Sequence, residues 1–197
     1  MTYLLGLTGS IGMGKSTTAR MFAEAGCAVW DADAAVHRLY APGGAAVAQM
    51  ADHFPGAIEN GAVSRERLKA IIARDANALT LIEQIVHPLV ARDRAAFLQE
   101  TDTEIAVLDI PLLFETGADK AMDAVVCVSV SPELQHKRVL DRPGMTEAQF
   151  HAILAKQLPD AEKRRRADYV IITDTEANAR AQVAAVIDDI KRKIAHA

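Results

Sequence analysis

The chain has 197 residues, of which 50% are hydrophobic and 24% are charged, and this length suits one folded domain with insertions. It contains no apolar run of about eighteen residues and no apolar leader, so we expect a cytoplasmic protein without a membrane partner. The net charge of −4 argues against a general attraction to nucleic acid, so we expect no nucleic-acid partner.

The first predicted elements are a buried strand over residues 3–8 and an amphipathic helix over residues 17–25 that ends at Gly26. Between them, residues 9–16 fill the phosphate-binding pattern G-x-x-x-x-G-K-[ST]. Glycines let such a loop turn its N–H groups toward phosphate oxygens, and the positive end of the following helix points at the same place. The pattern predicts a nucleoside triphosphate site; the alternative is a glycine-rich surface turn with an incidental lysine.

Within this loop, the candidate nucleotide contacts are Gly12, Met13, Gly14, Lys15, Ser16 and Thr17. Lys15 is a candidate catalytic residue, because the lysine of this pattern reaches the β and γ phosphates. The Ser16 hydroxyl would hold Mg²⁺.

Two carboxylates follow the second predicted strand, residues 28–30. In an extended segment, Asp31 and Asp33 would share one face at the end of the strand. Asp33 is a candidate catalytic residue, because an aspartate in hydroxyl-phosphorylating enzymes accepts a hydrogen bond from the attacking hydroxyl. The alternative is that Asp33 only caps a helix that begins near Ala34, which would contribute about 1 kcal/mol.

A long helical stretch separates the second and third predicted strands and is interrupted near Pro42 and Pro55. It is too long for a simple crossover between parallel strands. We therefore expect an acceptor-binding helical insertion over about residues 33–102.

The third predicted strand, residues 105–110, carries Asp109 near its end, where phosphate-loop proteins place a carboxylate that supports Mg²⁺. The alternative is that Asp109 only satisfies local backbone groups. Leu112 and Glu115 follow at the ligand-binding edge of the sheet and are candidates for acceptor binding, with core packing as the alternative. The six histidines lack the spacing of zinc ligands, so Mg²⁺ that arrives with the nucleotide is the metal that we expect.

After the fourth predicted strand, residues 124–130, a second helical stretch over about residues 132–167 predicts a mobile lid. Arg138 and Arg142 would face the same way on a helix. Arg142 is the third candidate catalytic residue, because a guanidinium near the phosphates neutralises charge that develops during transfer. The alternative is that these arginines only stabilise the end of a helix. We expect residues 163–166 to form a solvated basic face.

A fifth strand over residues 169–172 and a terminal amphipathic helix over residues 176–194 complete the predicted elements. Apolar strands that alternate with helices predict an α/β fold with three layers, in which helices cover both faces of a parallel sheet. Cys27 and Cys127 are expected to be buried thiols that act as small hydrophobic side chains.

Several blocks of the sequence carry a family resemblance when they are taken together. They are residues 6–17, 31–33, 111–115 and 135–138, the pairs His87-Pro88 and Ala167-Asp168, and Gln157. With this spacing the chain resembles dephospho-coenzyme A kinase over nearly its whole length. The resemblance implies ATP-dependent phosphorylation of the ribose 3′-hydroxyl of dephospho-coenzyme A, the last step of coenzyme A synthesis.

The resemblance also implies a five-stranded P-loop kinase core related to the nucleoside monophosphate kinases. This core would comprise about residues 1–32, 103–131 and 168–197. Asp33 is then the catalytic carboxylate, and His87 belongs to the acceptor region. The alternative for His87 is ordinary capping before a proline at the first position of a helix.

Two residues depart from the family pattern. Met13 replaces a small residue, which is harmless if its side chain points outward, and Thr173 replaces an asparagine that would contact adenine. Two other functions are alternatives: a P-loop kinase of another small acceptor, and a nucleotide-dependent regulatory switch. A guanine-specific switch would carry an N-K-x-D segment, and no asparagine of this chain is followed by lysine. The sequence does not specify an oligomeric state.

Overall fold

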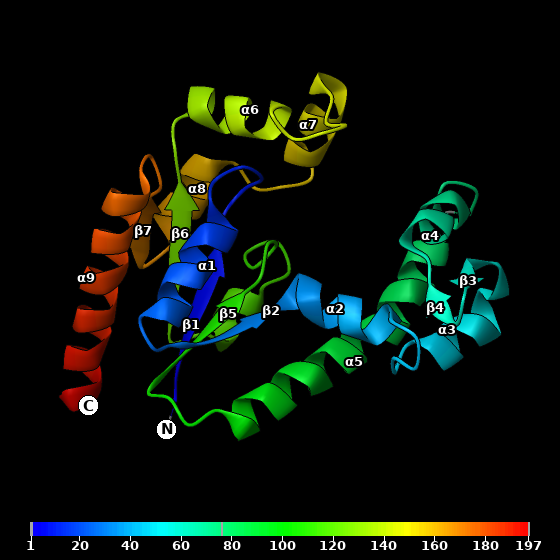
Figure 1. Cartoon of the computed structure of the whole chain (residues 1–197), viewed down its shortest axis with the longest axis horizontal. Coiled ribbons are helices and arrows are strands. Elements are labelled where there is room, and N and C mark those ends of the chain that lie inside the picture. The colour runs from blue at the N-terminus through cyan, green and yellow to red at the C-terminus, as the bar shows by residue number, and fades with distance from the viewer. Residues whose placement is uncertain (1, 76, 197) are drawn as a thin grey trace. The chain divides into compact units, whose positions relative to one another are not determined.

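The computed structural model describes residues 2–75 and 77–196 of the chain (Figure 1). They divide into two compact units, one made of residues 2–30 and 101–196 and the other of residues 31–75 and 77–100. The second unit is an insertion in the chain of the first, between its second and third strands. Residues 132–167, expected to form a lid, belong to the first unit.

The first unit alternates strands and helices in the predicted order. Its elements are β1 (Tyr3–Thr8), α1 (Lys15–Glu24), β2 (Ala28–Asp31), β5 (Ile105–Asp109), the 3₁₀ helix η2 (Ala118–Ala121), β6 (Ala124–Ser129), α6 (Pro132–Leu140), α7 (Glu147–Leu154), α8 (Asp160–Arg166), β7 (Tyr169–Ile172) and α9 (Glu176–Ala195). Both β5 and β6 end one residue earlier than predicted, and β5 does so because its pairing with β1 stops at Asp109, opposite Leu7. The largest difference is that α1 begins at Lys15, two residues earlier than predicted.

The five strands form one parallel sheet in the order β2-β5-β1-β6-β7. Strand β1 lies in the middle, with Leu5 opposite Val107 of β5 on one side and Ala124 of β6 on the other. Because the strands are parallel, the loops after β1, β5, β6 and β7 leave the sheet at the same edge, where open α/β sheets bind their ligands.

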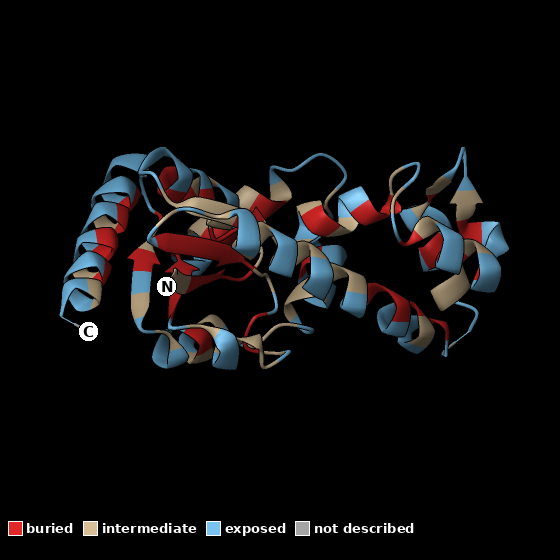
Figure 2. Cartoon of the chain, turned by 90° about the horizontal axis from the view of Figure 1, so that it is seen from below, coloured by how far each residue is buried: buried red, intermediate tan, exposed pale blue. Residues whose placement is uncertain are grey.

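Helices cover both faces of this sheet, as the three-layer prediction requires. Alternate residues of β6 point to opposite faces, so that Val126 and Val128 pack with α1 and α9, whereas Val125 packs with Leu113 and Phe114. Figure 2 shows the result, with buried positions along the strands and on the inner face of α9. The α/β prediction with a five-stranded parallel sheet is confirmed.

The second unit has its own hydrophobic core, built mainly from the inner faces of its helices. Its elements are α2 (Ala32–Tyr40), α3 (Val47–His53), the 3₁₀ helix η1 (Pro55–Ala57), β3 (Ile58–Glu59), β4 (Ala62–Val63), α4 (Arg65–Ile72) and α5 (Ala78–Glu100). The insertion is mainly helical, and it also contains an antiparallel hairpin of β3 and β4 that was not predicted. Its two turn residues, Asn60 and Gly61, both have positive φ, which is the hairpin turn that an Asn-Gly pair favours.

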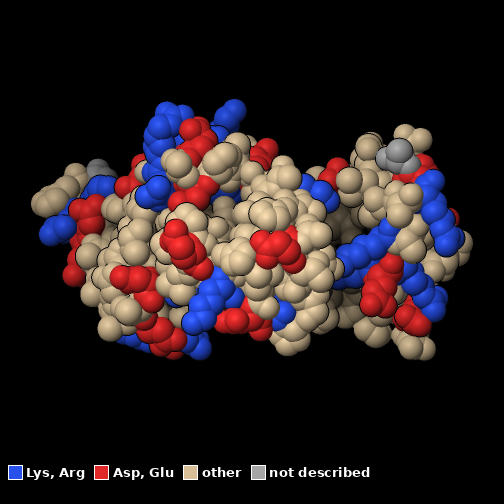
Figure 3. All heavy atoms as spheres, turned by 90° about the horizontal axis from the view of Figure 1, so that it is seen from above, with Lys and Arg blue, Asp and Glu red and all other residues tan. Residues whose placement is uncertain are grey.

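Charged side chains of both signs cover the surface. On the face drawn in Figure 3, acidic and basic groups are interspersed, in keeping with the small net charge of −4. Within the described ranges, no helix has both the length and the apolar character that a bilayer-spanning segment requires.

The two cysteines differ in burial. Cys127 is buried in β6, but Cys27 is only partly buried, so the expectation of two buried thiols was wrong for Cys27, which precedes β2. Burial above all, with the nearby Asp160 carboxylate adding to it, raises the pKa of the Cys127 thiol to about 12. Burial also raises the pKa of Cys27.

We therefore expect Cys127 of the folded protein to resist alkylation at pH 8. The thiolate is the reactive form, and a pKa near 12 instead of 9 leaves about 10³-fold less of it. Peptide mapping after a timed reaction with iodoacetamide would measure this, with the protein in denaturant as the control. Equal labelling of Cys127 in the folded and denatured protein would contradict the prediction.

Candidate active site

The loop between β1 and α1 depends on glycine at three positions. Gly12 and Gly14 have φ of 78° and 88°, a region that residues with a side chain seldom adopt. A Cβ on Gly12 would lie 2.4 Å from Val139 Cγ2, and one on Gly14 would lie 2.9 Å from Thr173 Oγ1. A Cβ on Gly9 would lie 2.4 Å from Val128 Cγ2. Close packing thus requires glycine at position 9, and both close packing and the backbone turn require it at positions 12 and 14.

Helix α1 begins directly after this loop, with Gly14 as its N-cap residue. The first turn of α1 contains no acidic residue, and Gly14 has no side chain to cap its amides. The positive end of the helix dipole is therefore not offset by a protein carboxylate in that turn, which is the arrangement that favours a bound anion. Ser16 lies in this first turn and is exposed, so its hydroxyl is accessible to a metal-bound nucleotide.

Lys15 and Asp109 form an ion pair through Nζ and Oδ1. Asp109 ends β5 with only 1% of its side chain exposed, and the neighbouring strand β1 leads into the loop that carries Lys15. The two residues predicted to act on the triphosphate and its metal are thus in contact. In the part of the chain that the structure describes, no cluster of three His, Cys, Asp or Glu side chains could hold a metal alone.

A cavity of about 280 Å³ lies beside the loop and the start of α1. Its walls come from the loop and α1, from the end of α6, and from the segment between β7 and α9. The polar lining includes Arg138, Arg142, Thr173 and Glu176. The cavity is therefore continuous with the candidate phosphate-binding residues and can accept a polar, partly anionic ligand.

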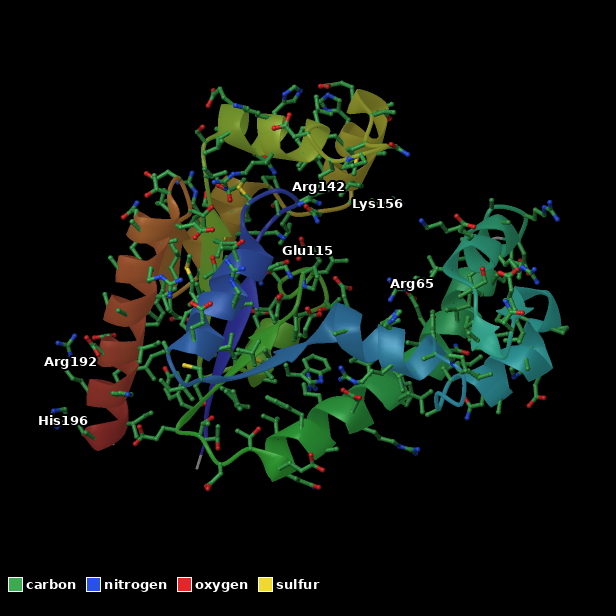
Figure 4. The ribbon with its side chains drawn as sticks, viewed as in Figure 1. Arg65, Glu115, Arg142, Lys156, Arg192 and His196 are labelled. Atoms are coloured by element: carbon green, nitrogen blue, oxygen red, sulfur yellow. The ribbon has the colours of Figure 1, made fainter. Side chains whose placement is uncertain are left out.

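Arg138 and Arg142, which line this cavity, were expected to lie on one helix, but they do not. Helix α6 ends at Leu140, so Arg138 is helical and Arg142 lies in the turn that follows (Figure 4). The Arg138 guanidinium donates to Thr173 Oγ1 at 3.1 Å and to the Thr173 carbonyl at 2.6 Å. Thr173 in turn donates from Oγ1 to the Met13 carbonyl at 2.7 Å. Arg138 and Thr173 thus connect α6 to the phosphate-binding loop.

Met13 does not point outward. Met13 is 2% exposed and belongs to the hydrophobic core between the sheet and helices α1 and α9. Its sulfur accepts a hydrogen bond from the Val130 amide at 3.2 Å. The flexible thioether fills the space between the loop and β6, so the Met13 side chain is not available to a nucleotide.

Glu115 lies in the loop after β5 (Figure 4). Its Oε1 accepts from the Leu158 amide at 2.8 Å and pairs with Lys163 Nζ at 2.9 Å. Burial tends to raise the pKa of this carboxyl, but the Leu158 amide and the Lys163 ammonium outweigh burial and hold the pKa below its ordinary value. Leu112 of the same loop is exposed, whereas its neighbours Leu113 and Phe114 are buried in the core.

The prediction of a solvated basic face at residues 163–166 was wrong for Lys163, which is 0% exposed. The pairing with Glu115 allows its ammonium to be buried. The three arginines that follow do lie at the surface, each paired with a carboxylate.

In the second unit, Asp31 and Asp33 occupy different positions at the start of α2. Asp31 is the N-cap of α2, since its Oδ1 accepts from the Ala34 amide at 3.0 Å. Asp33 is exposed in the first turn of the helix, so the expectation of a shared extended face and the alternative of capping by Asp33 were both wrong. The Asp33 carbonyl accepts from Arg65 Nη2 at 3.5 Å, and Arg65 also lies over the Tyr40 ring. Arg65 was not predicted from the sequence, although Ser64 before it is a typical N-cap residue and indicates that a helix begins at Arg65.

His87 is exposed in the interior of α5, where Pro88 follows it. The alternative of capping before a first-position proline is therefore wrong. His87 stays a candidate for acceptor binding.

Comparison with known proteins identifies the relatives of this chain. The sequence model of the dephospho-CoA kinase family matches residues 3–179. A dephospho-CoA kinase of Ruegeria pomeroyi is 61% identical over 197 residues, which is 100% of both chains. The chain belongs to the dephospho-CoA kinase family. A relative of the same description from Cereibacter sphaeroides is 58% identical and covers 96% of each chain.

Solved structures agree with the fold of a dephospho-CoA kinase family member. A crystal structure from Thermus thermophilus has a TM-score of 0.85 at 30% identity, covering 95% of this chain and 97% of that one. A dephospho-CoA kinase from Campylobacter jejuni has a TM-score of 0.66 at 22% identity, covering 96% and 97%, and supports the fold alone. The predicted family and the P-loop kinase fold are confirmed.

Proposed function

We propose that this dephospho-CoA kinase family member transfers the γ-phosphoryl group of ATP to the ribose 3′-hydroxyl of dephospho-coenzyme A, with Mg²⁺ bound alongside the donor. The observation that carries the proposal is the glycine loop, which leads into an uncapped helix with Lys15 at its start. Family membership supplies the acceptor.

The donor half of the site is built from the main chain. Amides from Gly12 to Thr17 would bind the phosphate oxygens, and the Lys15 ammonium would lie against the β and γ phosphates. Mg²⁺, when bound, would neutralise charge on these phosphates, and the Ser16 hydroxyl and the Asp109 carboxylate fit its preference for oxygen ligands. Lys15 is already paired with Asp109. The Asp109 carboxylate could therefore orient both the Lys15 ammonium and Mg²⁺.

On the acceptor side, Asp33 would accept the hydrogen bond of the ribose hydroxyl and take its proton as the new bond forms. A loose transition state for phosphoryl transfer makes little demand on base strength, so the carboxylate acts mainly by orienting the nucleophile. Its support is the family resemblance and its place two residues after the end of β2. His87, Leu112 and Glu115 are proposed to contribute to acceptor binding, and Glu115 would do so through the loop that it anchors.

Arg142 would counter charge that develops on the transferring group. It lines the cavity beside the loop. Within the described part of the chain its guanidinium makes no hydrogen bond or ion pair, unlike that of Arg138. A cation so placed is available to the nucleotide.

We expect Arg142→Ala to lower kcat by about 10²-fold or more, because a donor aimed at developing charge acts chiefly in the transition state. The KM for dephospho-coenzyme A should change much less. Steady-state kinetics with a coupled ADP assay would measure both. Arg192→Ala, which removes an exposed arginine of α9 (Figure 4), is the matched control and should behave as the unmodified protein. A raised KM with an unchanged kcat would contradict a role of Arg142 in stabilising the transition state.

The acceptor is tested by ADP release with a panel of alcohols. With Mg-ATP present, dephospho-coenzyme A should accelerate ADP formation far more than a nucleoside monophosphate or a polyol. A larger acceleration by another acceptor would point to a different small-molecule kinase. A slow rate that no acceptor changes would indicate the regulatory switch.

A further inference from the structure

Two glutamines hold the phosphate-binding loop at a single residue. The Ile11 N–H donates to Gln157 Oε1 at 3.2 Å, and Gln135 Nε2 donates to the Ile11 carbonyl at 2.8 Å. Because a backbone N–H only donates and a carbonyl only accepts, these contacts fix which end of each side-chain amide faces the loop. Ile11 immediately precedes Gly12, the first of the two positive-φ glycines.

Both glutamines come from the stretch that the sequence predicts to be a lid. Gln135 is a buried residue of α6, and Gln157 lies between α7 and α8. Helix α6 packs directly on the loop, since Gly12 faces both Val139 and the Gln135 carbonyl. The loop conformation therefore depends on residues more than a hundred positions away in the sequence.

The segment that carries Gln157 is itself held in place. The adjacent Leu158 amide donates to Glu115 at 2.8 Å, and Glu115 is paired with the fully buried Lys163 of α8. Gln157 and Leu158 thus connect the phosphate-binding loop to the loop after β5. A buried ion pair beside this connection limits how far Gln157 can move without breaking contacts.

We propose that Gln135 and Gln157 are positioning residues for the triphosphate: by holding both backbone groups of Ile11, they keep the loop in its binding conformation before the nucleotide arrives. The inference rests on the proposed donor site. A loop that is already ordered loses less conformational freedom on binding, so pre-organisation raises affinity without any new contact to the ligand. The effect acts on donor binding, whereas Arg142 acts on the transfer step.

The first test compares Gln157→Met with Gln149→Met. Methionine is similar in size and cannot make the amide hydrogen bond. Gln149 forms the capping box of α7, so its replacement costs a comparable local contact without touching the loop. We expect Gln157→Met to weaken binding of a non-hydrolysable ATP analogue with Mg²⁺ by about tenfold, the loss of roughly one hydrogen bond. Gln149→Met should bind it as the unmodified protein does.

Kinetics separate positioning from general loss of structure. For Gln157→Met, the KM for ATP should rise by a similar factor, while kcat at saturating ATP stays within about threefold. A fall in kcat with an unchanged KM for ATP would overturn the proposal. So would equal nucleotide affinity in Gln157→Met and the unmodified protein.

The second test uses the direction of the two hydrogen bonds. Glutamate keeps an oxygen that can accept from the Ile11 N–H, but it cannot donate to the Ile11 carbonyl. Without nucleotide, the thermal midpoint of Gln157→Glu should therefore lie above that of Gln157→Met. The midpoint of Gln135→Glu should lie below that of Gln135→Met. If the Glu variant had the higher thermal midpoint at both positions, or the lower one at both, the assigned directions of the two hydrogen bonds to Ile11 would be overturned.

The outcome is independent of the acceptor. If the analogue binds as expected, and binds more weakly to Gln157→Met, the inference holds even when dephospho-coenzyme A is not phosphorylated. In that case only the acceptor assignment would fail.

Discussion

Replacing Lys15 by alanine is expected to lower kcat/KM by at least about 10²- to 10³-fold, the scale seen when one donor to developing charge is removed. The ammonium would no longer reach the β and γ phosphates, and the buried Asp109 carboxylate would lose its contact with this cation. The second effect also costs stability, because removing one member of a buried pair leaves a poorly compensated charge. Initial rates of ADP formation at several ATP concentrations would measure the loss.

Two controls separate catalysis from unfolding. Lys191→Ala removes an exposed lysine of α9 and should leave the rate unchanged. Thermal unfolding of Lys15→Ala establishes whether the protein is folded at the assay temperature. A folded Lys15→Ala protein with a rate close to that of the unmodified protein would refute the role of Lys15.

Asp33→Asn is expected to lower kcat by about 10²- to 10⁴-fold, because an amide cannot accept the proton of the attacking hydroxyl. Binding of ATP should change little, since Asp33 is proposed to act on the acceptor. The measurement is kcat under saturating donor and acceptor, with nucleotide binding measured separately.

Asp31→Asn is the matched control two residues earlier. The Asp31 side chain caps α2, and asparagine caps a helix about as well as aspartate does. The substitution should therefore leave both the fold and the rate nearly unchanged. If Asp31→Asn were the slow enzyme and Asp33→Asn the normal one, the two assignments would have to be exchanged.

Much of the fold was predictable because the strands are buried on both faces. Apolar runs as short as those of β5 and β6 are typical of strands inside a parallel sheet, and their alternation with helices indicates that the sheet is parallel. The phosphate-binding pattern also located the start of α1 to within two residues. The fixed glycine of the pattern at position 14 has a positive φ, which restricts the residue type there.

The remaining features depend on contacts between segments distant in the sequence. A basic run such as residues 163–166 is typical of a solvated surface, and nothing local shows that Lys163 meets Glu115. Met13 fills a space that exists only after the loop packs on β6. The two glutamines that hold Ile11 likewise lie 124 and 146 positions away from it.

Local signals were also misjudged. The Asn60-Gly61 pair is a strong hairpin signal, yet the strands on either side are only two residues long and show no periodic pattern. For Asp31 and Asp33 the choice of cap depended on whether the helix began at Ala32 or near Ala34. That boundary is set by hydrogen bonding in the sheet and the helix rather than by residue type.

The most direct test of the whole account is a single-turnover reaction with γ-labelled ATP, Mg²⁺ and dephospho-coenzyme A. We expect the label to move to the acceptor and the labelled product to co-migrate with coenzyme A, phosphorylated at the ribose 3′-hydroxyl. Label found only as free phosphate, or on another hydroxyl of the acceptor, would contradict it.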